Sequence, residues 1–331
     1  MTQLENYNKI NRSFKKELIY NLGSEAGFYS EFNNMVFAIL FCLKNNYRFI
    51  LFSSDAFFKI KLGWEDYFEP FCESTNFIYH SKFNNRRKEP KLNTGWKIIR
   101  KLYRLSNPDT LLTYQLWGCF FNSKFETEEF DFPELGFKGN LREASKKIVE
   151  MIYNFNSPTK DKIRSIISKI NLPLKYASVH IRRGDKFTEV DFLPVSIYIE
   201  KLKKHTEIKS VFVFTDDYSI IEELQNNYPE FIYYCLVEKN EKGYVHGEFV
   251  KMGEKEKEKK QLSLLASMEI ICESECFIGT YTANPGIFAG MRMPDEKIHS
   301  VQKASWYQFQ NQDVIYHYQE RRKALKNINR F

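Results

Sequence analysis

Apolar and polar positions follow a regular order in the second half of the chain. Short apolar runs, typical of buried strands, are separated by longer segments in which apolar residues recur at helical spacing. The predicted strands are residues 176–181, 211–214, 231–235 and 276–279, and the predicted helices are residues 158–170, 194–204, 219–226, 261–272 and 284–291. Strands separated by helices of this length predict an α/β fold with a parallel sheet.

The first half has a weaker pattern, typical of a mixed domain. Residues 35–43 continue from a polar stretch into a predicted apolar helix, and residues 47–52 (YRFILF) form a predicted buried strand. No internal repeat and no long polar linker is visible. A length of 331 residues favours two domains over one.

Composition narrows the class of protein. Hydrophobic residues make up 43% of the chain, which is enough for two cores, and the net charge of +7 is mild for this length. Such a charge suits an anionic ligand but is no evidence for nucleic acid. The longest apolar run has nine residues, too few to span a bilayer, and the N-terminus lacks the apolar region of a signal peptide. We therefore expect a cytoplasmic protein without a transmembrane segment. Its six irregularly spaced cysteines are expected to be free thiols.

A basic segment, residues 82–104, interleaves lysines and arginines with apolar residues. The apolar positions recur at helical spacing, which predicts an amphipathic helix with a solvated basic face. A functional alternative is a surface for an anionic acceptor or for lipid headgroups, which would make peripheral membrane contact. Nucleic-acid binding through the same residues is a further alternative, which strong weakening by salt would support.

Charged residues follow the strand at 176–181 directly. Residues 180–189 (HIRRGDKFTE) contain two adjacent arginines, a lysine, a histidine and two acids. The planar guanidinium group binds phosphate oxygens at two points, and a fixed cation stabilises a departing diphosphate without a metal. This loop therefore predicts a phosphate site.

Two further loops follow strands of the same predicted sheet. Asp216 and Asp217 are adjacent rather than alternate, which disfavours a metal site; one is expected to cap the next helix and the other to orient a base or ribose. Residues 279–286 (GTYTANPG) lead from a strand into a helix, whose free N–H groups favour anions. Carboxyl ends of parallel strands share one sheet edge, so the arginine loop and residues 279–286 are expected to form two walls of one diphosphate site.

These loops resemble the motifs of the GT-B fucosyltransferase superfamily, most closely its α1,6 branch, which includes core and nodulation-factor fucosyltransferases and is related to protein O-fucosyltransferases. Residues 180–189 resemble the HxRRxDK signature, residues 212–217 (FVFTDD) the second motif, and residues 264–291 the third. Residues 27–33 (GFYSEFN) are similar to the first glycine-containing loop, which implies that Gly27 and Asn33 lie at an acceptor or donor loop. Residues from about 81 to 170 have no counterpart.

The resemblance implies two facing α/β domains, the second with a Rossmann-like, doubly wound parallel sheet. We expect an acceptor-side domain over residues 1–170, a domain that binds a GDP-sugar over residues 171–300, and a helix over residues 301–331 that packs back across the hinge. The implied reaction is inverting, metal-independent transfer of fucose from GDP-β-L-fucose to a hydroxyl of a glycan, with no cofactor. An oligosaccharide or a lipid-linked glycan is the expected acceptor.

The matching positions suggest a role for each residue. Glu189 falls near the position of the catalytic carboxylate, with Asp191 as the nearest rival base, and Lys186 is placed to keep Glu189 ionised. Arg182 and Arg183 are expected to stabilise the leaving GDP, and Asp185 to organise the loop. The residues expected to bind the nucleotide sugar are His180, Arg182, Arg183, Lys186, Asp216, Asp217, Ser267, Thr282 and Asn284.

One departure from the family pattern concerns recognition of the guanine base of GDP. Ser267 stands where the α1,6 enzymes have an aspartate that reads guanine, so either Glu269 or a backbone group reads the base, or guanine selectivity is weaker. Another GDP-linked sugar is therefore an alternative donor. A non-catalytic relative that binds a nucleotide sugar or a glycan is a second alternative, which the joint presence of the histidine, both arginines, the lysine and the following glutamate disfavours.

Overall fold

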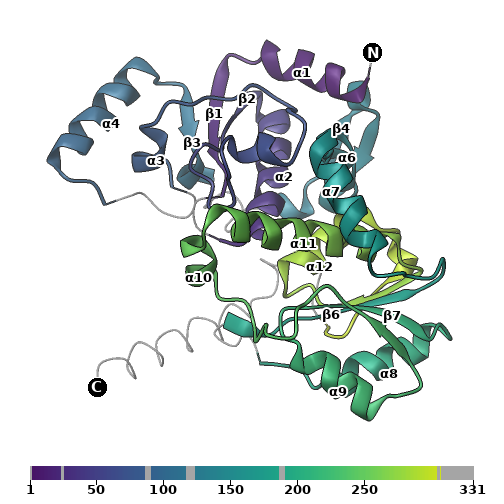
Figure 1. The fold of residues 1–331 in the computed structure, drawn as a ribbon. Coiled ribbons are helices and arrows are strands. Elements are labelled where there is room, and N and C mark those ends of the chain that lie inside the picture. The colour runs from purple at the N-terminus through teal and green to yellow at the C-terminus, as the bar shows by residue number, and fades with distance from the viewer. Residues whose placement is uncertain are drawn as a thin grey trace. The chain divides into compact units, whose positions relative to one another are not determined.

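The computed structural model describes residues 2–23, 26–85, 91–116, 124–185, 191–303 and 306. The chain divides into two compact units, Met1–Thr159 (unit 1) and Lys160–Phe331 (unit 2). Each unit contains its own parallel sheet, so the predicted α/β class is confirmed (Figure 1). No helix in the described part of the chain is both long enough and apolar enough to cross a membrane.

Unit 1 contains a three-stranded parallel sheet in the order β2-β1-β3 and a small antiparallel pair, β4-β5. Its main elements are α1 (Gln3–Ser13), β1 (Lys16–Asn21), α2 (Phe28–Asn45), β2 (Tyr47–Phe52), α3 (His80–Phe83), α4 (Thr94–Ser106), β3 (Thr110–Leu112), β4 (Phe130–Phe132), β5 (Phe137–Gly139), α6 (Leu141–Ile152) and α7 (Ser157–Ser168), which continues into unit 2. The predicted helix at 35–43 is thus the middle of a longer helix, and the strand at 47–52 is confirmed.

The core of unit 1 is built around α2. This helix is apolar on nearly every side because it is buried on nearly every side, and Met35 through Leu40 are fully buried. It ends at Asn46, whose left-handed backbone (φ 57°) is one that asparagine tolerates better than most residues. Aromatic rings fill the space beside it, including Trp64 and Phe68, which stack with ring centroids 4.1 Å apart.

Unit 2 is a doubly wound sheet of five parallel strands in the order β10-β9-β6-β7-β8. Its main elements are β6 (Ala177–Ile181), α8 (Val195–His205), β7 (Ser210–Thr215), α9 (Ser219–Asn227), β8 (Ile232–Tyr234), α10 (His246–Lys251), α11 (Glu254–Glu273), β9 (Cys276–Gly279), α12 (Asn284–Arg292) and β10 (Ile298–Ser300). The strands and helices predicted over residues 158–291 are all present. The helix predicted over residues 301–331 lies outside the described residues, apart from residues 301–303 and 306. The pattern did not predict the short α10 and β10.

The two faces of this sheet are covered by different helices. The helices α8 and α9 cover one face, and α11 and α12 cover the other (Figure 1). Apolar side chains of β6, β7 and β9 pack with α8 and α9 in one core cluster. Ser178 of β6 makes a hydrogen bond with Ser274, which directly follows α11 (Oγ–Oγ 2.8 Å). The strand order reverses between β6 and β9. Ligands of open α/β sheets bind at such a switch point, outside the carboxyl ends of the strands.

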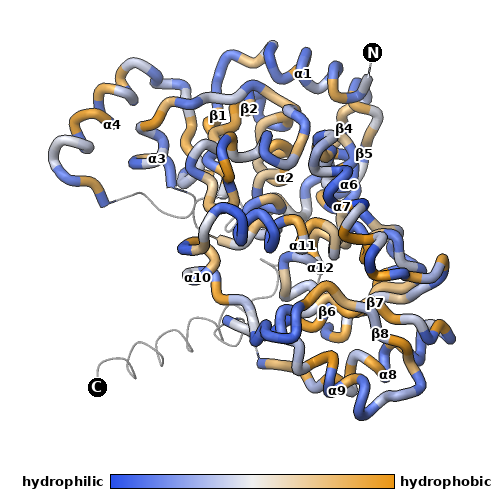
Figure 2. Tube along the Cα trace, in the orientation of Figure 1, coloured by the Kyte–Doolittle hydropathy of each residue, from blue (hydrophilic) through white to orange (hydrophobic). Residues whose placement is uncertain are grey.

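The charged run at residues 254–260 forms the first turns of α11, which appear as a blue stretch of the tube in Figure 2. Its side chains pair with neighbouring segments: Lys259 lies 2.6 Å from Glu238, and Lys260 lies 2.9 Å from Glu241. The run is therefore the solvated start of a helix.

Candidate functional site

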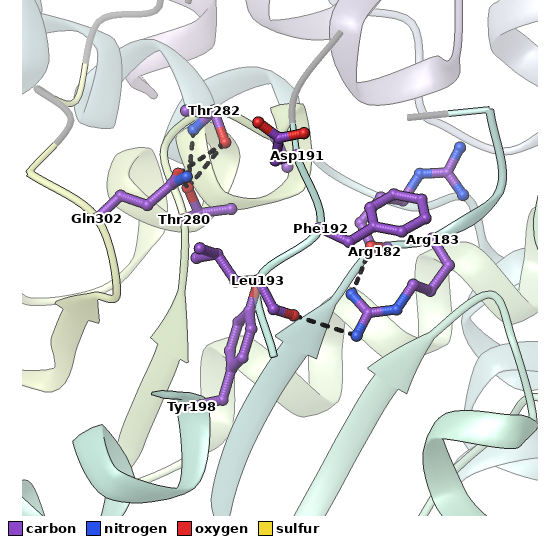
Figure 3. Close-up of a pocket in the computed structure, with 10 residues that line it drawn as sticks. Arg182, Arg183, Asp191, Phe192, Leu193, Tyr198, Thr280, Thr282 and Gln302 are labelled. Atoms are coloured by element: carbon purple, nitrogen blue, oxygen red, sulfur yellow. Dashed lines mark hydrogen bonds between the residues drawn. The ribbon is translucent and has the colours of Figure 1, made fainter. Parts of the chain in front are cut away.

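A pocket lies at the switch point of unit 2, where the chain leaves β6 and β9. Side chains of both loops and of the segment leading into α8 surround it (Figure 3). The pocket is lined by Arg182, Arg183, Asp191, Phe192, Leu193, Tyr198, Thr280, Thr282, Ala283 and Gln302. The sheet topology thus brings the first and third predicted loops together.

Arg183 is one of the two arginines that line this pocket. Its guanidinium group lies 5.0 Å from the centre of the Phe192 ring and donates to two backbone carbonyls, Arg182 O (3.3 Å) and Leu193 O (3.2 Å). No carboxylate among the described residues is within ion-pair distance of it, and burial lowers its pKa from the ordinary arginine value. Arginine stays protonated in proteins, so a partly buried positive charge is held at the mouth of the sheet without an ion-pair partner among the described residues.

The Arg182 side chain points away from that of Arg183 (Figure 3). It is enclosed by partners of its own. It donates to Asp185 Oδ1 (2.7 Å), forms an ion pair with Asp216, and lies 5.0 Å from the centre of the Tyr244 ring. Asp185 also accepts from the backbone N–H of His246 (3.1 Å). This cluster fixes the loop after β6 against the segment before α10.

Asp216 holds the same loop through the backbone. Its carboxylate accepts from the N–H of Arg183 (2.7 Å) and from the N–H of Tyr244 (2.8 Å). Gly184 permits the close approach, because a Cβ there would lie 2.4 Å from Tyr244 O and its φ is +55°. The structure therefore engages Asp216 with the arginine loop, whereas we expected a carboxylate here to orient a base or ribose.

Asp217 follows Asp216 directly, and His180 lies two residues before Arg182. Asp217 accepts from the N–H (2.9 Å) and the hydroxyl (2.7 Å) of Ser219, the first residue of α9. The N-cap position is Tyr218, which makes no side-chain cap, so a capping role for Asp217 stays a prediction. His180 is buried in β6, and its ring stacks on Phe214 with centroids 4.7 Å apart. His180 does not line the pocket, and its position next to Arg182 is set by the strand.

The loop after β9 supplies hydroxyl groups and a helix N-terminus. Thr280 and Thr282 both donate to Oε1 of Gln302, and the N–H of Thr282 donates to the Thr280 hydroxyl (3.2 Å). α12 begins immediately afterwards without a side-chain cap. Gly286 brings this helix close to the strand end, because a Cβ there would lie 2.1 Å from Thr280 O. Such a corner suits an anionic group.

The remaining predicted residues lie elsewhere. Lys186 and Glu189 are outside the described residues, whereas Asp191 lines the pocket. Ser267 is buried within α11, and Glu269 pairs with Arg292, so neither is a pocket residue. Asn284 is the first residue of α12.

Gly27 and Asn33 belong to unit 1. Gly27 precedes α2, where its carbonyl accepts from the N–H groups of Ser30 (2.9 Å) and Glu31 (3.2 Å), and Asn33 is fully buried in the same helix. Both therefore have a defined structural place in the helix that forms the core of unit 1.

Four pocket residues were not predicted: Phe192 and Leu193, which follow Asp191 directly, and Tyr198 and Gln302. Tyr198 sits in α8 among apolar residues and has the spacing of a core residue, and it is indeed 4% exposed. Gln302 lies beyond β10, at the start of the segment predicted as a terminal helix. The sequence carries no signal for either, because each reaches the pocket only through the folding of the sheet.

Carboxylates and histidines do not cluster as metal ligands in the part of the chain that the structure describes: no group of three or more His, Cys, Asp or Glu side chains is arranged to hold a metal ion. The two adjacent aspartates instead accept hydrogen bonds from backbone, hydroxyl and guanidinium groups.

Comparison with solved structures identifies the fold. A NodZ α-1,6-fucosyltransferase soaked with GDP-fucose matches with a TM-score of 0.50 and 14% identity, covering 85% of this chain and 94% of that one. Fucosyltransferase NodZ from Bradyrhizobium matches with the same TM-score and coverage at 11% identity. The chain has the fold of the GT-B fucosyltransferases. No family model matches the sequence, and no curated protein matches it significantly.

Proposed function

We propose that this protein is an inverting, metal-independent glycosyltransferase that moves fucose from GDP-β-L-fucose to a hydroxyl of a glycan acceptor. The observation that carries the proposal is the partly buried Arg183 guanidinium, which has no carboxylate partner among the described residues and faces a pocket at the sheet's switch point. The GT-B fucosyltransferase fold and the NodZ structure soaked with GDP-fucose support this choice of donor.

The leaving group is the first chemical problem of such a transfer. When the glycosidic bond breaks, negative charge develops on the diphosphate of GDP. A fixed guanidinium stabilises this charge more than it stabilises the intact donor, which lowers the barrier. In the proposal Arg183 binds the diphosphate directly, while the hydroxyls of Thr280 and Thr282 and the N-terminus of α12 face it from the loop after β9.

Arg182 acts differently in this proposal. Its guanidinium group is committed to Asp185, Asp216 and the Tyr244 ring, so it holds the backbone from which Arg183 projects. The positive charge that a metal supplies in other transferases comes here from arginine, and we therefore propose that no metal is obligatory.

The acceptor hydroxyl needs a base. Glu189 remains our predicted base, and Asp191, which lines the pocket, is the alternative. A single in-line displacement by the deprotonated hydroxyl inverts the anomeric carbon, so the product from the β-linked donor is an α-fucoside.

Calorimetric titration of GDP, GDP-fucose, UDP and ADP, with and without EDTA, tests the donor half of the proposal. We expect selective binding of the guanine nucleotides, unchanged by EDTA. Arg183→Ala removes a charge-assisted contact to phosphate and is expected to weaken GDP binding about ten- to a hundredfold. Arg164→Ala is the matched control, because that arginine is exposed in α7 and makes only a loose contact with Asp161 (3.7 Å).

Transfer of fucose to oligosaccharide and lipid-linked acceptors tests the other half. If Glu189 is the base, Glu189→Gln abolishes transfer but leaves GDP affinity near the wild-type value, while Asp191→Asn retains transfer; the reverse result assigns the base to Asp191. GDP binding without transfer to any acceptor, or transfer from another GDP-sugar only, would replace the proposed reaction by one of its two alternatives. Failure to bind any guanine nucleotide refutes the proposal.

A further inference from the structure

Helix α4 (Thr94–Ser106) leaves part of its apolar surface uncovered. It contains no fully buried residue, although six of its residues are apolar or aromatic. Ile98, Leu102 and Leu105 are 55%, 59% and 69% exposed. Their spacing of four and then three residues places them on one face of the helix, and we call them the exposed stripe. In Figure 2 the orange of apolar residues alternates with blue along α4.

A different side of α4 holds it on unit 1. Trp96 packs against the Tyr79 ring with centroids 5.3 Å apart, and Tyr103 packs against Phe77 (5.9 Å) and Phe83 (5.2 Å). These contacts fix the orientation of the helix. The exposed stripe therefore belongs to a helix that already packs on unit 1 through its other side.

The charges of α4 are all of one sign. The helix carries Lys97, Arg100, Lys101 and Arg104 and contains no acidic residue. Arg104 is used within unit 1, where it donates to Thr110 O (3.2 Å) and Gln115 Oε1 (2.8 Å). Lys97 and Lys101 are exposed, and neither has an ion-pair partner among the described residues.

The positions of these lysines relative to the stripe matter. Each immediately precedes a residue of the stripe, and successive helical residues are about 100° apart around the axis. Lys97 and Lys101 therefore line one edge of the apolar face. Ile78, in the segment that packs on α4, is itself 70% exposed and adds apolar surface to unit 1.

We infer that α4 is a membrane-surface helix that binds bilayers containing anionic lipids. The exposed stripe enters the boundary between headgroups and acyl chains, and Lys97 and Lys101 contact lipid phosphates. The charge pattern favours a membrane over other partners. A basic edge beside an apolar stripe matches the anionic headgroups and the hydrocarbon of a bilayer. A soluble polyanion would contact only the lysines, and a second copy of the chain would bring like charges together. The inference is independent of the proposed reaction.

Sedimentation of the full chain with lipid vesicles tests the inference. Vesicles of phosphatidylcholine alone are compared with vesicles of phosphatidylcholine and phosphatidylglycerol in equal parts. We expect binding to the anionic vesicles only, weakened by salt. Lys97→Gln with Lys101→Gln is expected to weaken binding about thirtyfold, since each basic residue near an anionic surface contributes about fivefold. Leu102→Ser with Leu105→Ser is expected to weaken it tenfold or more.

Matched variants in unit 2 control for total charge and hydrophobicity. Lys239→Gln with Lys255→Gln removes two exposed lysines, and Leu174→Ser removes a fully exposed leucine; both are expected to bind vesicles like the wild type. Because every changed side chain is exposed, circular dichroism and GDP affinity should not differ between variants.

Three results would overturn the inference. One is no binding of the wild type to anionic vesicles, and another is equal binding by the α4 variants. The third is a polyanion such as heparin, or a second copy of the chain detected by light scattering, that binds through the same residues while vesicles do not.

Discussion

The two adjacent aspartates at the end of β7 are chemically equivalent in the sequence but not in the structure, and this difference can be measured. Asp216 accepts two backbone N–H groups, at 2.7 and 2.8 Å, and pairs with Arg182; its side chain is 14% exposed and that of Arg182 is 19% exposed. Among the described residues, Asp217 accepts only from the N–H and hydroxyl of Ser219. We therefore predict that Asp216→Asn is severely destabilising and Asp217→Asn is nearly neutral.

The magnitude follows from the contacts. An asparagine at 216 keeps one oxygen, so one of the two N–H groups faces an NH₂ donor and Arg182 loses a counter-charge. Breaking a buried ion pair costs about 3–5 kcal/mol, and because Arg182 keeps Asp185 at 2.7 Å we expect the lower end, about 3 kcal/mol. Asparagine caps a helix as well as aspartate does, so Asp217→Asn should change stability by less than about 0.5 kcal/mol.

Hydrogen exchange with mass spectrometry measures the effect within unit 2 alone, which avoids assuming two-state unfolding of a two-unit chain. Amides of β6 and β7 should exchange about a hundredfold faster in Asp216→Asn, since 1.4 kcal/mol corresponds to about tenfold. GDP affinity should also fall, because Asp216 fixes the backbone of Arg183. If both variants exchange and bind alike, the loop is held by other contacts and our account of Arg182 is wrong.

Two further predictions concern His80 and Gly286. Burial among Phe52, Phe83 and other rings lowers the pKa of His80 to about 4, so the unfolded chain takes up a proton below pH 6.5 that the folded protein refuses. This contribution to the free energy of unfolding is complete above that pH and should fall by about 3 kcal/mol as the pH drops toward 4. Urea titrations at pH 7 and 4.5 measure the fall, which should be smaller for His80→Phe than for the wild type. An equal fall in both proteins would refute the assignment. Gly286→Ala forces a Cβ to within 2.1 Å of Thr280 O and should destabilise α12 by about 2 kcal/mol or more, whereas Gly247→Ala, which meets nothing within 4 Å, should be neutral in the same thermal melts.

The regular alternation in the second half made most of unit 2 predictable. Apolar runs such as residues 276–279 are short, are bounded by turns and stand between helices, so their type and approximate limits follow from local periodicity. The elements that were missed are short: β10 has three residues and α10 has six, too few for a period to be recognised. In unit 1 the strand β1 was also missed, because its polar first residues, Lys16 and Glu17, obscure the buried half.

The candidate site also has features that the sequence predicts and features that only the tertiary structure sets. The sequence alone determined that three chemically rich loops follow strands of one parallel sheet, because strand ends and charged runs are local features. Only the tertiary structure decided which side chain faces the pocket. Arg182 and Arg183 are neighbours of the same type, yet one is enclosed by Asp185, Asp216 and the Tyr244 ring, while the other is left without a carboxylate partner among the described residues.

The physical reason is that charge pairing depends on distances between residues that are far apart in the chain. Asp216 reaches the arginine loop because β7 lies beside β6. Tyr198 and Gln302 reach the pocket because α8 begins, and β10 ends, at the same sheet edge. Periodicity records which side of an element is apolar. It does not indicate whether Arg182 or Arg183 is paired with a carboxylate, because that depends on how the strands and loops pack.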